Sequence, residues 1–109
     1  MKLSAVSTAL TAYFSDHQIL LPDSLQKALL FGSFARGEAQ VGSDVDIALV
    51  AQDTWDFARR NQLRDWLEDF DVNLSIHPFF TTSEKLTQTQ DKFDANYWIA
   101  QEGVVLWQR

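Results

Sequence analysis

The sequence predicts an α/β domain in which helices flank a small mixed β-sheet. Two long segments carry apolar residues at helical spacing, and short apolar runs bounded by Gly or Asp alternate with them. A chain of 109 residues with 46% hydrophobic residues has the size and composition of one compact domain. We therefore expect residues 1–109 to form a single domain.

The first part of the chain predicts a helix followed by a buried strand. Apolar residues recur at helical spacing at Val6, Leu10, Tyr13 and Phe14. The predicted helix covers residues 4–16, and Ser4 can cap it because its hydroxyl accepts a hydrogen bond from a free N–H of the first turn. Residues 27–31, KALLF, form a short apolar run that ends at Gly32, which indicates a buried strand.

The middle of the chain predicts a turn, a second strand and a longer helix. We expect one helical turn at residues 33–38, and the apolar, β-branched run VDIALV at residues 45–50 favours a strand. Asp53 or Thr54 can cap a helix over residues 55–70. Its apolar face would comprise Trp55, Phe57, Ala58, Leu63, Trp66, Leu67 and Phe70.

The last part of the chain predicts a third strand and a final helix. Residues 71–77, DVNLSIH, alternate between polar and apolar, as in a strand with one buried face. Ser83 can cap a further turn of helix, and residues 93–101 favour a last helix with Gly103 as its left-handed cap. The run VVLW at residues 104–107 follows it.

Composition excludes several classes of function. A net charge of −6 with only nine Lys and Arg argues against an extended nucleic-acid-binding surface, which needs clustered basic residues. The absence of Cys excludes disulfides, thiolate metal sites and cysteine nucleophiles. The N-terminal segment lacks the long apolar run of a signal peptide or membrane span, so we expect a cytoplasmic protein with no membrane partner.

The segment FGSFARGEAQVGSDVDIALV, residues 31–50, combines residues that suit a nucleoside triphosphate and a magnesium ion. Gly32 permits close approach of a phosphate to the backbone, and Ser33 offers a hydroxyl and exposed N–H groups. Arg36, one turn later, can extend this contact to the phosphate tail. Ten residues after Ser33, Asp44 and Asp46 are two apart in a strand, so both can reach one or two cations on the same face.

Each part of this pattern has an ordinary structural explanation when taken alone. A Gly-Ser pair after a strand is usually a turn, an Asp-x-Asp is usually a solvated strand end, and a single Arg is usually on the surface. The joint occurrence in this order favours a nucleotide-binding scaffold. His17 and His77 have no third imidazole or carboxylate motif nearby, and we predict that they are surface or turn residues outside the site.

The stretch LFGSFARGEAQVGSDVDIAL resembles the signature of the minimal nucleotidyltransferases of the polymerase β superfamily, and the similarity extends to a C-terminal ending of the type IAQEGVVLW. The resemblance implies a polymerase β-like nucleotidyltransferase fold, with Mg²⁺ as cofactor and ATP as substrate. The residues that it places on the nucleotide are Gly32, Ser33, Arg36 and Ser43. It places Asp44 and Asp46 on the metal.

The family also has a third carboxylate on the next strand, between two aliphatic residues, where it deprotonates the attacking hydroxyl. In this chain the corresponding slot, Val72-Asn73-Leu74, holds Asn. Asp71 shares a face of the predicted strand with Asn73. It could substitute for the third carboxylate if the sheet register shifts or if its side chain reaches across to the site. Asn73 could bind a metal but could not act as a base. The predicted catalytic residues are thus Asp44, Asp46 and Asp71, and the predicted metal ligands are Asp44, Asp46 and Asn73.

The resemblance implies transfer of AMP from ATP to a hydroxyl of a partner protein. Family members of this size resemble the antitoxin half of two-component systems whose partner is a helical HEPN-domain toxin. The alternative is a binding module that has lost catalysis and restrains a helical partner by contact alone. Nucleotide or metal sensing without transfer is a third interpretation. The four Trp residues exceed what a small core needs and indicate a protein interface, and a homo-oligomer is also compatible with the sequence.

Overall fold

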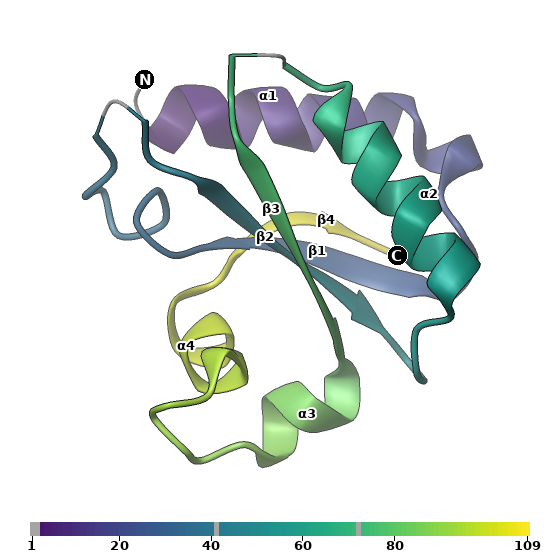
Figure 1. Cartoon of the computed structure of the whole chain (residues 1–109), viewed down its shortest axis with the longest axis vertical. Coiled ribbons are helices and arrows are strands. Elements are labelled where there is room, and N and C mark those ends of the chain that lie inside the picture. The colour runs from purple at the N-terminus through teal and green to yellow at the C-terminus, as the bar shows by residue number, and fades with distance from the viewer. Residues whose placement is uncertain (1–2, 41, 72) are drawn as a thin grey trace.

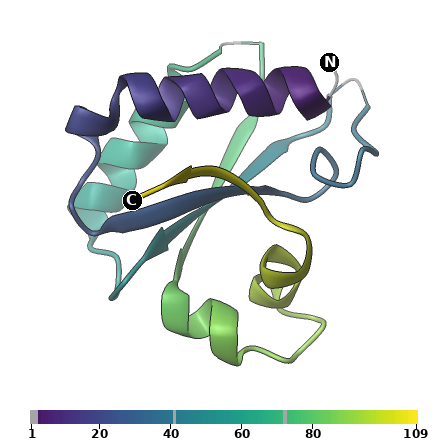
Figure 2. The same ribbon diagram turned by 180° about the vertical axis from the view of Figure 1, so that it is seen from behind.

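The computed structural model describes residues 3–40, 42–71 and 73–109, which form a four-stranded mixed sheet with helices on both faces (Figures 1 and 2). The elements in chain order are α1 (Leu3–Asp16), a 3-10 turn (Gln18–Leu20), β1 (Leu25–Phe31), β2 (Val45–Ala51), α2 (Phe57–Glu68), β3 (Ile76–Thr82), α3 (Ser83–Gln88), α4 (Ala95–Glu102) and β4 (Val104–Gln108). The strand order is β3-β2-β1-β4, with β2 parallel to β3 and the other pairs antiparallel. This architecture confirms the predicted fold class.

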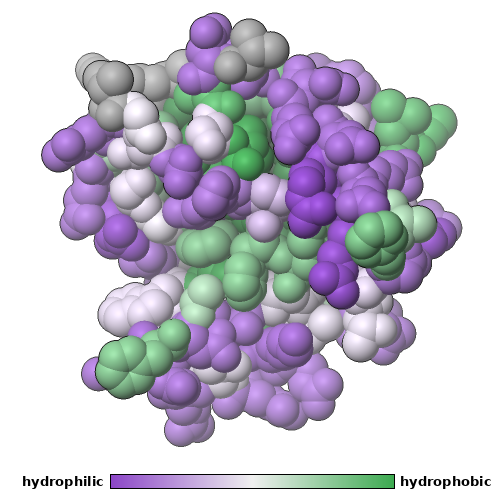
Figure 3. Space-filling view, in the orientation of Figure 1, coloured by the Kyte–Doolittle hydropathy of each residue, from purple (hydrophilic) through white to green (hydrophobic). Residues whose placement is uncertain are grey.

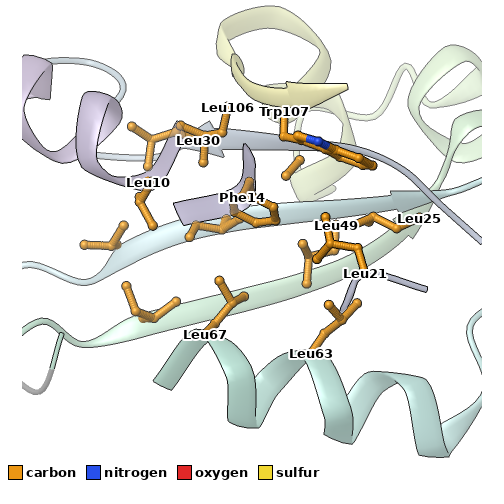
Figure 4. Packing of buried hydrophobic residues seen from close by; sticks show 14 of the residues in the cluster. Leu10, Phe14, Leu21, Leu25, Leu30, Leu49, Leu63, Leu67, Leu106 and Trp107 are labelled. Atoms are coloured by element: carbon orange, nitrogen blue, oxygen red, sulfur yellow. The ribbon is translucent and has the colours of Figure 1, made fainter. Parts of the chain in front are cut away.

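The central strand β2 is buried on both faces, which explains its nearly continuous apolar sequence. Val45, Ile47 and Leu49 point into the main core beneath α1 and α2. Figure 4 shows Leu10 and Phe14 of α1, and Leu63 and Leu67 of α2, among the side chains of this core. Position 46 therefore lies on the opposite face, on the side of α3 and α4.

That opposite face carries a smaller apolar cluster under the two short helices. Ala48 and Val50 of β2 pack there with Leu86 of α3 and Ile99 of α4. Apolar side chains remain visible at the surface in the middle of the molecule (Figure 3). The sheet thus has a larger apolar core on the side of α1 and α2 and a smaller one on the side of α3 and α4.

The predicted helix at residues 55–70 begins later than expected, at Phe57. Asp56 caps it, since its side chain accepts a hydrogen bond from the backbone N–H of Arg59. Trp55 lies before the helix and is buried, and its indole N–H donates to the carbonyl oxygens of Leu49 (3.1 Å) and Thr81 (2.9 Å). Phe57 is 78% exposed, so its assignment to the apolar face is wrong.

The predicted strand at residues 71–77 is wrong in position, because β3 begins only at Ile76 and continues to Thr82. Asp71 forms a turn instead: its Oδ1 accepts from the N–H of Asn73 at 2.9 Å, and its carbonyl accepts from Leu74 N–H at 3.1 Å. Val72 lies outside the described residues. The strand passes through Pro78, which is tolerated because β3 is an edge strand.

Two predicted helix caps are also wrong. Gly103 has φ −62°, so it is no left-handed cap; a Cβ there would lie 2.5 Å from the carbonyl oxygen of Ile99 and 3.4 Å from Leu29 Cβ. Glycine suits this position because a Cβ would collide with the Ile99 carbonyl oxygen in the last turn of α4. Helix α3 is capped by Thr82 rather than Ser83, because the Thr82 side chain accepts from Lys85 N–H.

Most of the Trp side chains are buried in the core or pack against it. Trp55 and Trp107 are buried, and Trp66 packs partly buried against the main core. Only Trp98, at 45% exposure, has a largely open side chain among these four. Across the described ranges, no helix combines the length and apolar content needed to cross a membrane.

Candidate functional site

The chain leaves β1 through a tight turn that begins at Gly32. This glycine has φ +76°, and its carbonyl accepts from Arg36 N–H at 3.1 Å, which closes one helical turn. Phe34 is only 4% exposed and anchors the turn in the main core. In the described part of the chain, the N–H groups of Ser33, Phe34 and Ala35 have no hydrogen-bond acceptor, so they are free to bind an anion.

The acidic pair lies directly beside this turn. Asp44 immediately precedes β2, and Asp46 is its second residue, paired with Phe31 across the antiparallel β1–β2 ladder. A Cβ at position 32 would overlap Oδ2 of Asp46, so the carboxylate packs against the bare backbone of Gly32. The glycine is thus required both by its positive φ and by the approach of the carboxylate. The turn and the acidic pair form one site.

The electrostatics of Asp46 suit a cation ligand. Burial raises the pKa of its carboxyl above the ordinary range, and nearby Asp44 raises it further, whereas His77 and Arg36 act to lower it. We find no hydrogen bond to this carboxylate from any described residue. A partly buried carboxylate with open oxygens gains most from a divalent ion.

His77 is a surface residue, as predicted, with a side chain that is 64% exposed, but it lies next to the acidic pair rather than apart from it. It is the residue of β3 that pairs with Asp46 in the parallel ladder, and its Nε2 lies 3.8 Å from Oδ2 of Asp44. The sequence contained one signal for this placement, since Phe79 to Thr82 are all strand-favouring residues and extend the strand beyond Pro78.

The structure places Asp71 and Asn73 in the turn before β3 rather than beside Asp46. The Asp71 carboxylate is engaged with the N–H of Asn73, and Asp71 is not among the charged groups that shift the pKa of Asp46. Asn73 is exposed and borders a surface pocket together with Ser43 and Gly42. The beginning of β3 at Ile76 removes the strand on which the convergence of Asp71 depended.

Ser43, the remaining predicted nucleotide contact, closes the turn that leads into Asp44. Its Oγ accepts from the N–H of Gln40 at 2.8 Å, and its own N–H donates to the Gln40 carbonyl at 2.9 Å. Gly42 has φ +87° in the same turn. The hydroxyl of Ser43 thus orders the approach to the acidic pair, and its role toward a nucleotide stays a prediction.

Arg36 is held by two glutamates. Its Nε donates to Glu38 Oε2 at 3.0 Å, and one terminal nitrogen donates to Glu102 Oε1 at 2.9 Å. These hydrogen bonds raise the pKa of the Arg36 guanidinium. Glu102 comes from the end of α4, so the phosphate-facing turn is tied to an element 66 residues away in the chain. Sequence reasoning did not identify Glu102.

The donor set fits a hard divalent ion shared with a phosphate. No group of three or more His, Cys, Asp or Glu is arranged to hold a metal among the residues that the structure describes. Magnesium is commonly bound through one or two carboxylates, with phosphate oxygens and water completing its octahedron. Asp44 and Asp46 supply such a pair, and the unpaired N–H groups after Gly32 lie where phosphate oxygens would be held.

Residues 10–109 match the family model described as polymerase beta, nucleotidyltransferase. The chain belongs to this nucleotidyltransferase family. The match covers the turn at Gly32, both aspartates and Glu102, and it confirms the resemblance read from the sequence. Among curated proteins, none is similar enough to match.

Several solved structures share the nucleotidyltransferase fold. A toxin–antitoxin structure with AMP-PNP has a chain 23% identical at TM-score 0.63, aligned over 94% of this chain and 73% of that one. A tri-AMPylated Shewanella oneidensis HEPN toxin in complex with an MNT antitoxin gives 19% identity and TM-score 0.59 over the same shares. A structure solved as a minimal nucleotidyltransferase has a chain 18% identical at TM-score 0.61, aligned over 95% of both chains. At these identities the likeness establishes the fold.

Proposed function

We propose that this chain is a magnesium-dependent nucleotidyltransferase that transfers AMP from ATP to a hydroxyl of a partner protein. The observation that carries the proposal is the packing of the Asp46 carboxylate against the Gly32 backbone. This contact joins an anion-binding turn to a cation-binding pair within one site. A nucleoside triphosphate with its metal is the ligand class that needs both at once.

The roles follow from the positions of the side chains. Asp44 and Asp46 would hold Mg²⁺, and the ion when bound would neutralise charge on the phosphates. The N–H groups of Ser33 and Phe34 and the guanidinium of Arg36 hold the triphosphate tail. The acceptor hydroxyl oxygen forms a bond to the α-phosphorus and releases its proton to solvent, while the bond from the α-phosphorus to the bridging β-phosphate oxygen breaks and pyrophosphate leaves. Positioning and charge neutralisation account for most of the catalysis in such transfers.

The partner in this proposal is a HEPN-domain toxin, with this chain as its antitoxin. Support comes from the solved complex of an AMPylated HEPN toxin with an MNT antitoxin, whose fold this chain shares. Further support comes from the accessibility of the acidic pair. The Asp44 side chain is 47% exposed, so an acceptor side chain can approach it.

A labelling experiment tests the proposal. The full chain is incubated with ATP labelled on the α-phosphate, MgCl₂ and the HEPN protein encoded beside it. We expect label on the partner with the unmodified chain and none with Asp44→Ala or Asp46→Ala. Asp16→Ala removes an exposed carboxylate at the end of α1 and serves as the matched control. Equal labelling by all four proteins would contradict the assigned site.

The second candidate function is a binding module without transfer activity. It is favoured by two features: Asn73 occupies the slot where the family resemblance implies a carboxylate, and the residue of β3 that pairs with Asp46 is His77. Under this interpretation the partner gains no label, and the double variant Asp44→Ala/Asp46→Ala binds the partner as tightly as the unmodified chain. Measuring the partner Kd alongside the labelling separates the two functions.

A further inference from the structure

We propose that Glu102, the last residue of α4, positions the guanidinium of Arg36 for the phosphate tail of the nucleotide. This inference rests on the proposed function and assigns a role to a residue outside the Gly-Ser and Asp-x-Asp motifs. Arg36 lies in the turn after Gly32, and Glu102 reaches it from the other end of the chain at 2.9 Å. Glu102 is therefore a positioning residue that acts through Arg36.

Arg36 can bind an anion while it donates hydrogen bonds to both glutamates. A guanidinium has five N–H donors in a planar fork. Glu38 takes the Nε donor and Glu102 takes one donor of a terminal nitrogen. The remaining three donors of the fork have no acceptor among the residues that the structure describes and can serve phosphate oxygens. Two carboxylates at fixed places around a planar group restrict its orientation, which lowers the entropy lost when a ligand binds.

Glu102 is the less exposed of the two carboxylates that bind Arg36. Its side chain is 19% exposed, whereas that of Glu38 is 65% exposed. Ion pairs at exposed positions contribute little because water and salt screen them. On this ground we expect the ion pair of Arg36 with Glu102 to be stronger than its ion pair with Glu38.

The placement of Glu102 is unfavourable for α4 on its own. A negative charge at the C-terminal end of a helix meets the negative end of the helix dipole. The last turn of α4 contains no basic residue that would compensate for it. The compensating charge comes from Arg36, so the pair stabilises a carboxylate where the local helix does not favour one.

Helix α4 is a rigid support for this carboxylate. Its N-terminal end is fixed where the hydroxyl of Thr81 donates to Oδ1 of buried Asn96. Near its C-terminal end, Ile99 is buried in the apolar cluster with Leu29 of β1 and Val50 of β2. A positioning group on such an element holds its target more closely than a group on a free loop.

Arg36 belongs to the same turn that contacts the acidic pair, since its N–H donates to the Gly32 carbonyl and Gly32 packs against the Asp46 carboxylate. The turn is thus in contact with Asp46 at Gly32 and with Glu102 of α4 through the Arg36 guanidinium. A triphosphate bound through that metal would extend its tail toward Arg36.

The test measures nucleotide affinity by isothermal titration calorimetry in MgCl₂ with two probes, ATP and AMP. We expect Glu102→Ala to weaken ATP binding by about threefold to tenfold and to leave AMP binding unchanged, because Arg36 serves the tail that AMP lacks. Glu102→Gln keeps an acceptor oxygen and should give an intermediate ATP affinity. Glu84→Gln, on the exposed face of α3, is the charge-matched control with unchanged affinity for both.

The direction of the change in ATP affinity distinguishes a positioning role of Glu102 from a simple effect of its charge. Removing a negative charge near an anion site would by itself tighten ATP binding. Unchanged or tighter binding of ATP by Glu102→Ala would therefore overturn the inference, as would an equal loss for AMP. In an Arg36→Ala background, Glu102→Ala should cause no further loss of ATP affinity; an additive loss would also overturn the inference.

Two further controls keep the outcomes distinct. Thermal unfolding of each variant shows whether it folds, and if Glu102→Ala does not, Glu102→Gln carries the same comparison. If the unmodified chain binds no ATP in MgCl₂, the proposed function and this inference fail together. If it binds ATP and the Glu102 variants match it, only this inference fails.

Discussion

Two regions of the molecule contribute to the site in different ways: the segment from Gly32 to Asp46, and the segment from Asp71 to Thr82. The first is continuous in the chain, and its glycine and carboxylate contact each other directly. The second reaches the site only through the parallel pairing of β3 with β2, which brings His77 to Asp46. A motif whose residues are close in the chain can be recognised from their spacing. A residue that reaches the site across a sheet, such as His77, depends on the register between two strands, which residue spacing does not specify.

The largest effect should come from Gly32→Ala. The new Cβ would overlap Oδ2 of Asp46, and φ +76° is unfavourable for Ala. We expect a loss of at least about a hundredfold in transfer rate, since small displacements of reacting groups have effects of that size. Gly37→Ala is the matched control: it has φ +73° and no atom within 4 Å of an added Cβ. Equal losses in both variants would show that backbone strain, rather than the carboxylate contact, explains the effect.

A gain of activity should follow from His77→Asp. The variant places a carboxylate on β3 beside Asp46, and so on the strand that follows the acidic pair in the chain. If transfer is limited by its absence, the labelling rate should rise by about tenfold, within the range of general base catalysis. His77→Asn, which is close in size and has no charge, should show no gain. A decrease with His77→Asp would show that the imidazole itself is needed.

A smaller effect concerns the stability of the folded protein. Burial raises the pKa of Asp46 in the folded state above its unfolded value, so the folded state binds more protons between the two and stability falls as pH rises through that window. We expect Asp46→Asn to raise the free energy of unfolding at pH 7 by no more than about 1 kcal/mol, because the carboxyl is partly solvated. The gain should disappear below the unfolded pKa of about 4. Urea unfolding at pH 7 and at low pH measures this difference, and an unchanged gain at low pH would argue against a titrating Asp46.

The smallest effect should come from Asp71→Asn. Asn can accept the same hydrogen bond from the N–H of residue 73, so the turn is preserved while the charge is lost. We expect an unchanged labelling rate. A loss of tenfold or more would restore Asp71 as a catalytic carboxylate and would show that the turn before β3 moves toward the acidic pair.

The sequence was sufficient for the elements whose signals are local. The apolar run before Gly32 and the run after Asp44 predicted β1 and β2, and their spacing predicted the acidic pair. The position of β3 was misread because alternation at Asp71 to Ser75 fits a strand as well as it fits a turn. There the Asp71 side chain competes for backbone N–H groups. The ion pair of Arg36 with Glu102 could not be predicted, because the two are brought together only by the packing of α4 on β1.

The central claim is that the turn at Gly32 and the acidic pair form one site for a metal and a triphosphate. Calorimetric titration of ATP into the full chain, with MgCl₂ and with EDTA, tests it most directly. The structure predicts binding that requires the metal and is lost in Asp44→Ala/Asp46→Ala. Equal ATP affinity in EDTA, or in the double variant with MgCl₂, would contradict the claim.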